Sequence, residues 1–329
     1  MLRLPEFEII GRYFAPLSLG RPGTFQLKND GAVIAANAGE EIIVSTDTMI
    51  ADVHFLSNDL PRDIAAKLLA VNFSDVASMG GRPVAYTLAT SWPNSVDEAW
   101  IAEFASGLLE AQNTIGVCLI GGDTVSTPGP LMLNITAFGE VPLGCALTRS
   151  GTLSGEEVYV TGTIGDAALG LKCLRGEIKC SEMDSKYLER RYHLPTARSN
   201  FGQELPGIAS AAIDISDGLA ADLQQLAEQS RIDIDINLSD IPLSEAAGRL
   251  LAAGQTNWTS LISGGDDYEL ALSIPSSFTQ KLSALGVSTN IPVTKIGTVS
   301  ETRGAAPMAR FYGETGKLLH IKNLGYQHF

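Results

Sequence analysis

The sequence predicts a protein of two domains in which strands and helices alternate, an α/β (α+β) class. The chain has 329 residues, about twice the length of a typical domain. Apolar residues follow strand-like and helix-like spacings in turn along both halves. A segment rich in glycine and hydroxyl side chains, Thr148–Glu156, separates the halves. We therefore expect one domain over residues 1–148 and a second over 149–329.

The first domain is expected to contain four strands and two helices. The strands are short apolar runs that end near polar or turn-forming residues, at Glu41–Thr48, Ala85–Thr90, Val117–Ile120 and Leu131–Val141. The helices have apolar residues three and four positions apart, at Arg62–Met79, which ends at Gly80-Gly81, and Asp97–Thr114, which Gly116 would stop.

The second domain repeats this alternation around a second sheet. Its expected strands are Glu157–Thr163, Ala211–Ile215, Ile232–Leu238, Tyr268–Ile274 and Ile291–Val299. Its expected helices are Asp166–Leu174 and Leu219–Ser230. Aspartate alternates with isoleucine in Ile232–Leu238, which is typical of a half-exposed strand.

The composition limits the classes of binding partner and the cellular compartment that we expect for this protein. Apolar residues make up 45% of the chain, which is enough for two cores. Lysine and arginine total 23 against 37 aspartate and glutamate, a net charge of −14, which argues against a nucleic-acid surface. No apolar run reaches the roughly 20 residues of a membrane span, so we expect no membrane partner. Four scattered cysteines without a CxxC pair favour a reducing, cytoplasmic setting.

Aspartates recur beside glycine or hydroxyl residues, mostly where a strand is expected to end. The instances are Asn29-Asp30-Gly31, Ser45-Thr46-Asp47, Ser74-Asp75, Gly121-Gly122-Asp123, Asp214-Ile215-Ser216-Asp217-Gly218 and Gly264-Gly265-Asp266-Asp267. Converging carboxylates repel one another unless cations neutralise them, and hard cations such as Mg²⁺ prefer oxygen ligands. The pattern therefore predicts a site that binds several magnesium ions and a polyphosphate.

Each motif taken alone has a plainer interpretation. A single Ser-Thr-Asp or Gly-Asp is more often a turn or a helix cap. Asp217-Gly218 could cap the helix that follows, and Ser74-Asp75 could face solvent on its helix. Other signatures are absent from the sequence: the P-loop, GxGxxG after a strand, kinase HRD and DFG, GxSxG and HExxH. The four histidines are dispersed, which makes a histidine-rich metal site improbable.

Seven strings together resemble the thiamine-monophosphate kinase family. They are STDTMIADVHF, VNFSDVASMGGRP, IGGDT, LTRSG, IDISDGL, SGGDDYEL and GYQHF, in the same order from about Phe7 to Phe329. The wider superfamily includes aminoimidazole ribonucleotide synthetase, selenophosphate synthetase and a hydrogenase-maturation protein. The first and sixth strings favour the thiamine branch.

The resemblance implies a fold and a reaction. The fold would be the two-domain aminoimidazole ribonucleotide synthetase-like one, with N-terminal domains that pair in a homodimer and form a β-barrel. The reaction would be ATP-dependent phosphorylation of thiamine monophosphate to thiamine diphosphate, the last step of that cofactor's biosynthesis. The attacking phosphate oxygen is already ionised near neutral pH, so direct transfer needs no general base and no covalent catalytic residue.

The resemblance also assigns residues. Magnesium would be bound by Asp30, Ser45, Thr46, Asp47, Asp75, Asp123, Asp214 and Asp217. ATP would contact Gly122, Asp123, Arg149 and Ser216, and thiamine monophosphate would contact His54, Asp266 and Tyr326. The first motif departs from the family pattern, because Asn29 stands where an acidic neighbour of Asp30 is usual. The loss of one negative charge predicts a weaker metal affinity.

Two alternatives stay open. Another enzyme of the superfamily, such as aminoimidazole ribonucleotide synthetase, would also use ATP but would close a ring. Selenophosphate synthetase is disfavoured, because its reactive N-terminal Cys or selenocysteine has no counterpart before Cys118. A protein that binds nucleotide or thiamine without turnover is supported only by Asn29.

Overall fold

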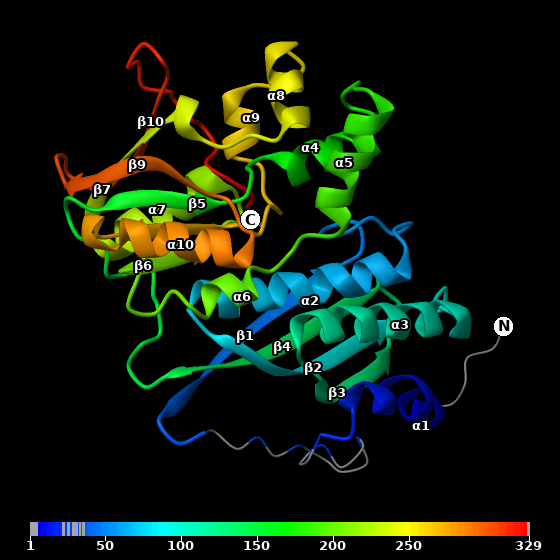
Figure 1. Ribbon diagram of the computed structural model, residues 1–329. Coiled ribbons are helices and arrows are strands. Elements are labelled where there is room, and N and C mark those ends of the chain that lie inside the picture. The colour runs from blue at the N-terminus through cyan, green and yellow to red at the C-terminus, as the bar shows by residue number, and fades with distance from the viewer. Residues whose placement is uncertain are drawn as a thin grey trace. The chain divides into compact units, whose positions relative to one another are not determined.

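The computed structural model describes residues 6–21, 24, 27, 32, 34 and 37–327. Two compact units make up the chain. Unit 1 comprises Met1–Val76 and Gly81–Gly144, and unit 2 comprises Ala77–Gly80 and Cys145–Phe329. Strands and helices alternate in each unit (Figure 1). The division at Gly144 and Cys145 falls just before the glycine- and hydroxyl-rich segment Thr148–Glu156.

Unit 1 is built on a four-stranded sheet in the order β1-β4-β2-β3. The strands are β1 (Glu40–Ile50), β2 (Arg82–Trp92), β3 (Leu119–Ser126) and β4 (Met132–Pro142). β4 pairs antiparallel with both β1 and β2, and β2 pairs parallel with β3. β1 and β3 are therefore the edge strands of the sheet.

Two long helices, α2 (Pro61–Ser78) and α3 (Glu98–Ile115), lie over one face of this sheet (Figure 1). α3 begins where the Asp97 side chain accepts a 2.9 Å hydrogen bond from the Trp100 N–H, and it ends at Gly116. The helices pack closely at Gly107, where a Cβ would lie 2.6 Å from the Arg62 Cα. Three short helical turns precede the sheet: α1 (Glu6–Ile9), η1 (Ile10–Phe14) and η2 (Ala15–Ser18).

Unit 2 is built on a six-stranded sheet in the order β10-β7-β9-β5-β8-β6. The strands are β5 (Glu157–Thr161), β6 (Ala211–Asp214), β7 (Ile232–Asn237), β8 (Leu270–Ile274), β9 (Val293–Glu301) and β10 (Ala309–Tyr312). Within this sheet the described pairing is parallel between β10 and β7 and antiparallel elsewhere.

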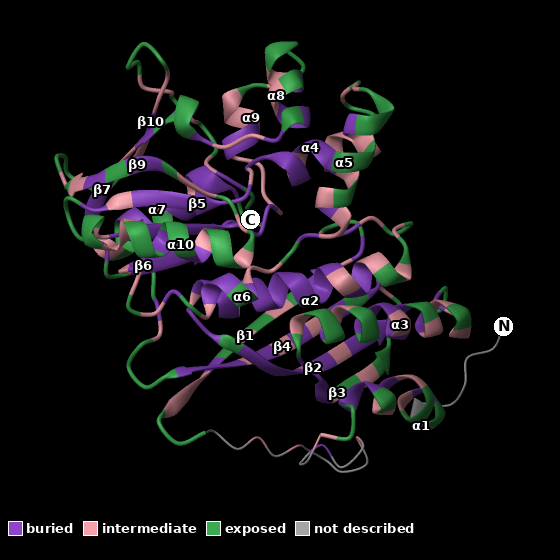
Figure 2. Ribbon diagram, in the orientation of Figure 1, coloured by how far each residue is buried: buried purple, intermediate pink, exposed green. Residues whose placement is uncertain are grey.

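Helices cover both faces of the six-stranded sheet. α7 (Leu219–Ser230) packs on the face that carries Val158 and Val160. α10 (Thr279–Thr289) packs on the opposite face, with Tyr159 and Leu272. Alternate residues of β5 thus enter two different cores, and β5 is largely buried (Figure 2), as is all of β8. This arrangement explains why β5 and β8 are apolar runs without alternating polar residues.

The remaining helices of unit 2 form a smaller core of their own. They are α4 (Asp166–Leu174), α5 (Glu182–His193), α8 (Glu245–Ala252) and α9 (Trp258–Ile262), packed through leucines such as Leu169, Leu188 and Leu250. The short turns are α6 (Ser199–Gly202), η4 (Leu238–Asp240) and η5 (Ser276–Phe278). No described helix is long and apolar enough to cross a membrane.

The expected strands and helices are present, but the placement of two motifs at strand ends was wrong. Ser45-Thr46-Asp47 lies inside β1, where Asp47 is opposite Ile135. Gly121-Gly122-Asp123 lies inside β3, where Asp123 is opposite Ala89. The sheet continues past both motifs because β4 and β2 are long enough to pair with them. In unit 2 the expected Tyr268–Ile274 strand begins later, at Leu270, because Tyr268 has a left-handed backbone with φ +50°.

Candidate functional site

In unit 1, carboxyl groups from β1 and α2 meet at one face of the sheet. Ser45 and Asp47 are two positions apart in β1, so both side chains point to the face covered by α2. The Ser45 hydroxyl donates a 2.5 Å hydrogen bond to Asp75 Oδ2 on α2. The Asp47 and Asp75 side chains are also hydrogen-bonded to each other. Asp75 is thus partly buried against β1 and is not a solvent-facing helix residue.

The environment of Asp47 disfavours its negative charge. Burial raises the pKa of Asp47 above its ordinary value, although the hydrogen bond with Asp75 and the charge of His54 act in the opposite direction. Two carboxyl groups in contact must share a proton or bind a cation between them. Asp47, Asp75 and Ser45 offer only oxygen atoms, which are the ligands that hard divalent cations prefer. The residues therefore fit magnesium.

The backbone around this carboxyl pair is fixed by two further contacts. The Asp47 N–H donates to Asn72 Oδ1 on α2, at 3.0 Å. His54 lies in the turn after β1, where its Nδ1 accepts a 3.0 Å hydrogen bond from the Ile50 N–H. Its Nε2 is then the nitrogen that carries a proton in the neutral ring.

Thr46 points away from the carboxyl pair. It is exposed, and its hydroxyl donates to the Ile135 carbonyl of β4 at 2.9 Å. Asn134 donates to the same hydroxyl at 3.2 Å. Strand alternation thus separates the Thr46 side chain from those of Ser45 and Asp47, and its metal role stays a prediction.

The Gly121-Gly122-Asp123 motif borders a pocket of about 110 Å³ within unit 1. Gly122 has no room for a side chain, because a Cβ would lie 1.9 Å from the Leu88 carbonyl oxygen. Apolar residues and a smaller number of threonine and aspartate residues line the pocket, which suits a ligand with an apolar body and polar groups. Its described lining residues are Ile10, Phe14, Thr24, Leu27, Leu88, Thr90, Leu119, Ile120, Gly121, Gly122, Asp123 and Thr124.

Asp47 and Asp123 stand on opposite edge strands of the sheet. The register runs from Asp47 through Ile135 and Leu88 to Gly122, which is three strand spacings or about 14 Å. Within one chain these two carboxylates cannot bind one ion directly. Accordingly, the described residues contain no group of three or more His, Cys, Asp or Glu placed to hold a metal. Asp30 lies outside the described residues, so the larger predicted cluster stays a prediction.

In unit 2 the Asp214–Gly218 loop joins β6 to α7 and is organised by a buried carboxyl. Asp222 Oδ2 accepts hydrogen bonds from three consecutive N–H groups, those of Ser216 at 3.1 Å, Asp217 at 3.2 Å and Gly218 at 3.1 Å. The pKa of Asp222 is raised well above its usual range by burial, with further upward contributions from the charges of Asp214 and Asp217. A cation that binds Asp214 and Asp217 would relieve this crowding of negative charge.

Two other segments bind this loop through their backbones. The Asp266 N–H donates to the Ser216 carbonyl at 2.9 Å, and the Tyr326 N–H donates to the Asp217 carbonyl at 3.0 Å. Gly265 is required there, since a Cβ would lie 2.4 Å from the Ser216 carbonyl oxygen. Unit 2 thus brings four predicted functional residues together: Ser216, Asp217, Asp266 and Tyr326. Tyr326 is 46% exposed.

Arg149 does not lie near this loop. It is exposed, and its carbonyl accepts a 2.8 Å hydrogen bond from the Ser230 hydroxyl at the C-terminal end of α7. The Asp214–Gly218 loop precedes the other end of the same 12-residue helix, about 18 Å away. The predicted contact between Arg149 and ATP stays a prediction.

Sequence reasoning assigned no role to Asp222, although the structure gives it the central place in its loop. The only signal was an aspartate inside the first turns of a helix that follows Asp217-Gly218. Asp267 and Glu269, in the string SGGDDYEL, likewise received no role and are almost fully buried.

Comparison with known proteins identifies the family. The sequence pattern of the AIR synthase related protein N-terminal domain matches residues 28–141, and that of the C-terminal domain matches residues 154–308. Thiamine-monophosphate kinase of Escherichia coli strain K12 is 37% identical over 327 residues, which cover 98% of each chain.

Solved structures agree with these matches. Thiamine-monophosphate kinase from Stenotrophomonas maltophilia K279a superposes with a TM-score of 0.84 at 34% identity, covering 97% of this chain and 99% of that one. AaThiL, solved in complex with AMPPCP and TMP, superposes with a TM-score of 0.78 at 26% identity, covering 100% and 99%. The two-domain, AIR synthase-like fold expected from the motifs is thereby confirmed. The chain belongs to the thiamine-monophosphate kinase family.

Proposed function

We infer that this protein is a thiamine-monophosphate kinase, which transfers the γ-phosphoryl group of ATP to thiamine monophosphate and yields thiamine diphosphate. The observation that carries this inference is the 37% identity to the Escherichia coli enzyme over 98% of both chains. The complex of AaThiL with AMPPCP and TMP supports both substrates, because AMPPCP is an analogue of ATP.

The paired carboxyls of unit 1 support magnesium as the metal of the reaction. We propose that Asp47 and Asp75, with Asp30, Ser45, Thr46 and Asp123, bind Mg²⁺ ions. When bound, Mg²⁺ supplies the positive charge that offsets repulsion between two anionic substrates and an acidic protein. In unit 2 we propose Asp214 and Asp217 as further ligands, next to the buried Asp222.

The chain's own task is to position the two phosphates. The terminal phosphate oxygen of thiamine monophosphate attacks the γ-phosphorus in line, and the bond to the β-phosphate oxygen breaks to release ADP. We propose that Gly122 and Asp123 contact ATP beside the unit 1 pocket, and that Ser216 and Arg149 contact ATP from unit 2. His54, Asp266 and Tyr326 would contact thiamine monophosphate, with the tyrosine ring against the cationic thiazolium.

We propose that the protein is a homodimer that pairs through unit 1. Both edge strands of its sheet carry exposed apolar side chains, Val44 on β1 and Val125 on β3, and Met132 on β4 is exposed as well. Exposed apolar side chains on edge strands are often covered by another chain. Sedimentation analysis of the wild type and of Val44→Glu tests this: the wild type sediments as a dimer and the variant dissociates. A monomeric wild type would refute the dimer.

We also propose a cytoplasmic location, where ATP is available and where the four free cysteines stay reduced.

A direct assay tests the function. Purified protein with ATP, Mg²⁺ and thiamine monophosphate should release ADP and form thiamine diphosphate in equal amounts. Unphosphorylated thiamine serves as the control acceptor, and a chelator should stop the reaction. Binding of ATP without ADP release would instead indicate a nucleotide-binding protein without turnover, and ring closure of an aminoimidazole precursor would indicate another enzyme of the superfamily.

A further inference from the structure

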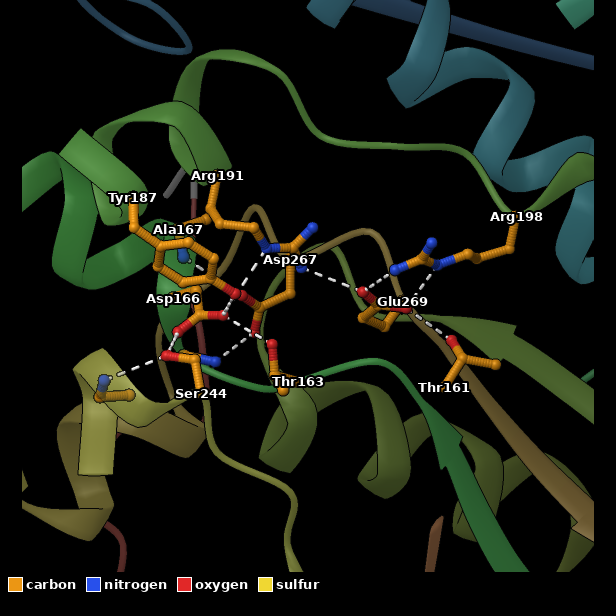
Figure 3. A network of polar contacts seen from close by, with 12 residues as sticks. Thr161, Thr163, Asp166, Ala167, Tyr187, Arg191, Arg198, Ser244, Asp267 and Glu269 are labelled. Atoms are coloured by element: carbon orange, nitrogen blue, oxygen red, sulfur yellow. Dashed lines mark hydrogen bonds and ion pairs between the residues drawn. The ribbon is translucent and has the colours of Figure 1, made fainter. Parts of the chain in front are cut away.

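In unit 2, Asp267 directly follows the proposed substrate contact Asp266 in the chain and belongs to a buried network of charged side chains (Figure 3). Its centre is Glu269, which is fully buried. Glu269 accepts hydrogen bonds from Thr161 Oγ1 at 2.7 Å, Arg191 Nη2 at 3.0 Å and Arg198 Nε at 2.6 Å. Two arginines therefore converge on one carboxylate just before β8.

Asp267 connects the segment before β8 to α4, a helix more than ninety residues earlier in the chain. Its carboxyl oxygens accept hydrogen bonds from the Gly165 N–H at 2.6 Å and the Ala167 N–H at 3.3 Å, at the start of α4. The N–H groups of a helix's first turn have no partner within the helix, so Asp267 acts as a cap supplied from outside. The side chain of Asp267 is 1% exposed.

The residues between these anchors have an unusual backbone. Asp266 has φ +72° and Tyr268 has φ +50°, both in the left-handed region that residues with a Cβ rarely occupy. A backbone of this kind persists only where surrounding contacts hold it. Asp267 and Glu269 supply those contacts on the buried side.

Tyr268 holds the side chain of Asp266 itself. The Tyr268 hydroxyl donates a 3.2 Å hydrogen bond to Asp266 Oδ1, and the tyrosine is 7% exposed. The Asp266 backbone is held in turn by the Ser216 carbonyl. The backbone and the side chain of Asp266 are therefore both restrained, and so is the neighbouring residue Asp267.

We propose that Asp267 and Tyr268 are positioning residues that orient the Asp266 carboxylate for recognition of thiamine monophosphate. The proposal rests on the proposed function and extends it, since neither residue is assigned a contact with substrate. Because thiamine carries a cationic thiazolium ring, a carboxylate fixed in direction binds it better than one that rotates freely. These two residues act on the affinity for thiamine monophosphate rather than on the affinity for ATP.

Tyr268→Phe is the first test, because it removes only one hydroxyl. The KM for thiamine monophosphate should rise roughly threefold to tenfold, as expected for the loss of one hydrogen bond, while kcat and the KM for ATP stay unchanged. Tyr187→Phe is the matched control. It removes a hydrogen bond of the same 3.2 Å length to Asp166, a carboxylate of the same network in the first turn of α4.

A double-mutant cycle separates positioning from general stability. In an Asp266→Asn background, Tyr268→Phe should have no further effect on the KM for thiamine monophosphate. Asp267→Asn should raise the same KM in the wild-type background and not in the Asp266→Asn background. Equal effects of Tyr268→Phe and Tyr187→Phe, additive effects in the cycle, or a parallel rise in the KM for ATP would each overturn the proposal. Wild-type turnover, measured first, tests the proposed function separately from these outcomes.

Discussion

At the scale of single residues, the contact between Asp47 and Asp75 is the feature that most needs a chemical explanation. Two carboxyl groups that touch in a partly buried place destabilise a protein unless a proton or a cation lies between them. Ser45 donates to one of them and Asn72 fixes the backbone of the other. These hydrogen bonds hold the two carboxyl groups in place, and the proposed role of the pair is to bind a cation.

Replacement of Asp75 by alanine should lower ATP-dependent formation of thiamine diphosphate at least roughly 100-fold, because charge neutralisation is the main catalytic contribution. Asp63→Ala is the control on the same helix, twelve residues and about 18 Å from Asp75. Its activity should stay near that of the wild type. Near-normal turnover of the Asp75 variant in a steady-state assay would remove Asp75 from the metal site.

Tyr326→Ala should raise the KM for thiamine monophosphate several-fold and the KM for ATP little, because the exposed ring is proposed to stack on thiamine. Tyr326→Phe keeps the ring and should behave like the wild type. Steady-state kinetics with each substrate varied separately distinguishes these outcomes, and equal changes in both KM values would argue against stacking.

Sequence reasoning identified single residues unevenly, and the reason is chemical. Ser216, Asp217, Asp266 and Tyr326 were predicted from motifs, and the structure brings them together. Asp222 and Asp267 were missed because the sequence does not distinguish an aspartate that holds a loop or caps a distant helix from one that binds a ligand. Only the fold shows that their partners are backbone N–H groups.

At the scale of elements, every expected helix and strand is present, but α5, α8, α9, α10 and β10 were not predicted. α5 was missed because half of its sequence EMDSKYLERRYH is charged, and only Asp184, Leu188 and Tyr192 are buried. β10 was missed because it has four residues and pairs only with β7 among the described strands. The predicted strand ended before β3 does, because two glycines usually end a strand, whereas here Gly122 allows close packing on β2.

Two glycines in helices of unit 2 should respond in opposite ways to replacement by alanine, because one is closely packed and the other is not. At Gly170 in α4 a Cβ would lie 2.1 Å from the Leu188 carbonyl oxygen, so Gly170→Ala should destabilise the protein by about 1–3 kcal/mol. At Gly248 in α8 no described atom lies within 4 Å, so Gly248→Ala should stabilise it by about 0.5–1 kcal/mol. Urea unfolding followed by circular dichroism measures both, and a stabilising Gly170 variant would contradict the close packing.

At the scale of the whole molecule, buried carboxyls link folding to pH. Burial raises the pKa of Asp267 to about 8, with an upward contribution from the Asp166 charge, while the N–H groups of Gly165 and Ala167 and the Arg191 charge oppose it. In the unfolded chain the group loses its proton near pH ~4. The folded state therefore holds a proton that the unfolded state lacks, and this contribution to stability is lost as the pH rises from about 4 to 8.

The free energy of unfolding should consequently fall with rising pH in this window, by up to about 1.4 kcal/mol per pH unit for one group. Asp267→Asn cannot titrate and should show a shallower slope. Some slope should remain, because burial also raises the pKa of Asp222. Denaturant unfolding of both proteins at several pH values checks this, and identical slopes would show that Asp267 is ionised throughout.

The contacts among the three loop segments of unit 2 that contain Ser216, Asp266 and Tyr326 also affect how the protein folds and unfolds. Ser216 contacts Asp266, and Asp217 contacts Tyr326, across separations of 50 and 109 residues along the chain. Contacts between such remote segments close large loops and tend to form after local helices and hairpins. Mild heating or a low concentration of denaturant should accordingly abolish turnover while most of the helical circular dichroism signal remains. Loss of activity would then be the first detectable step of unfolding.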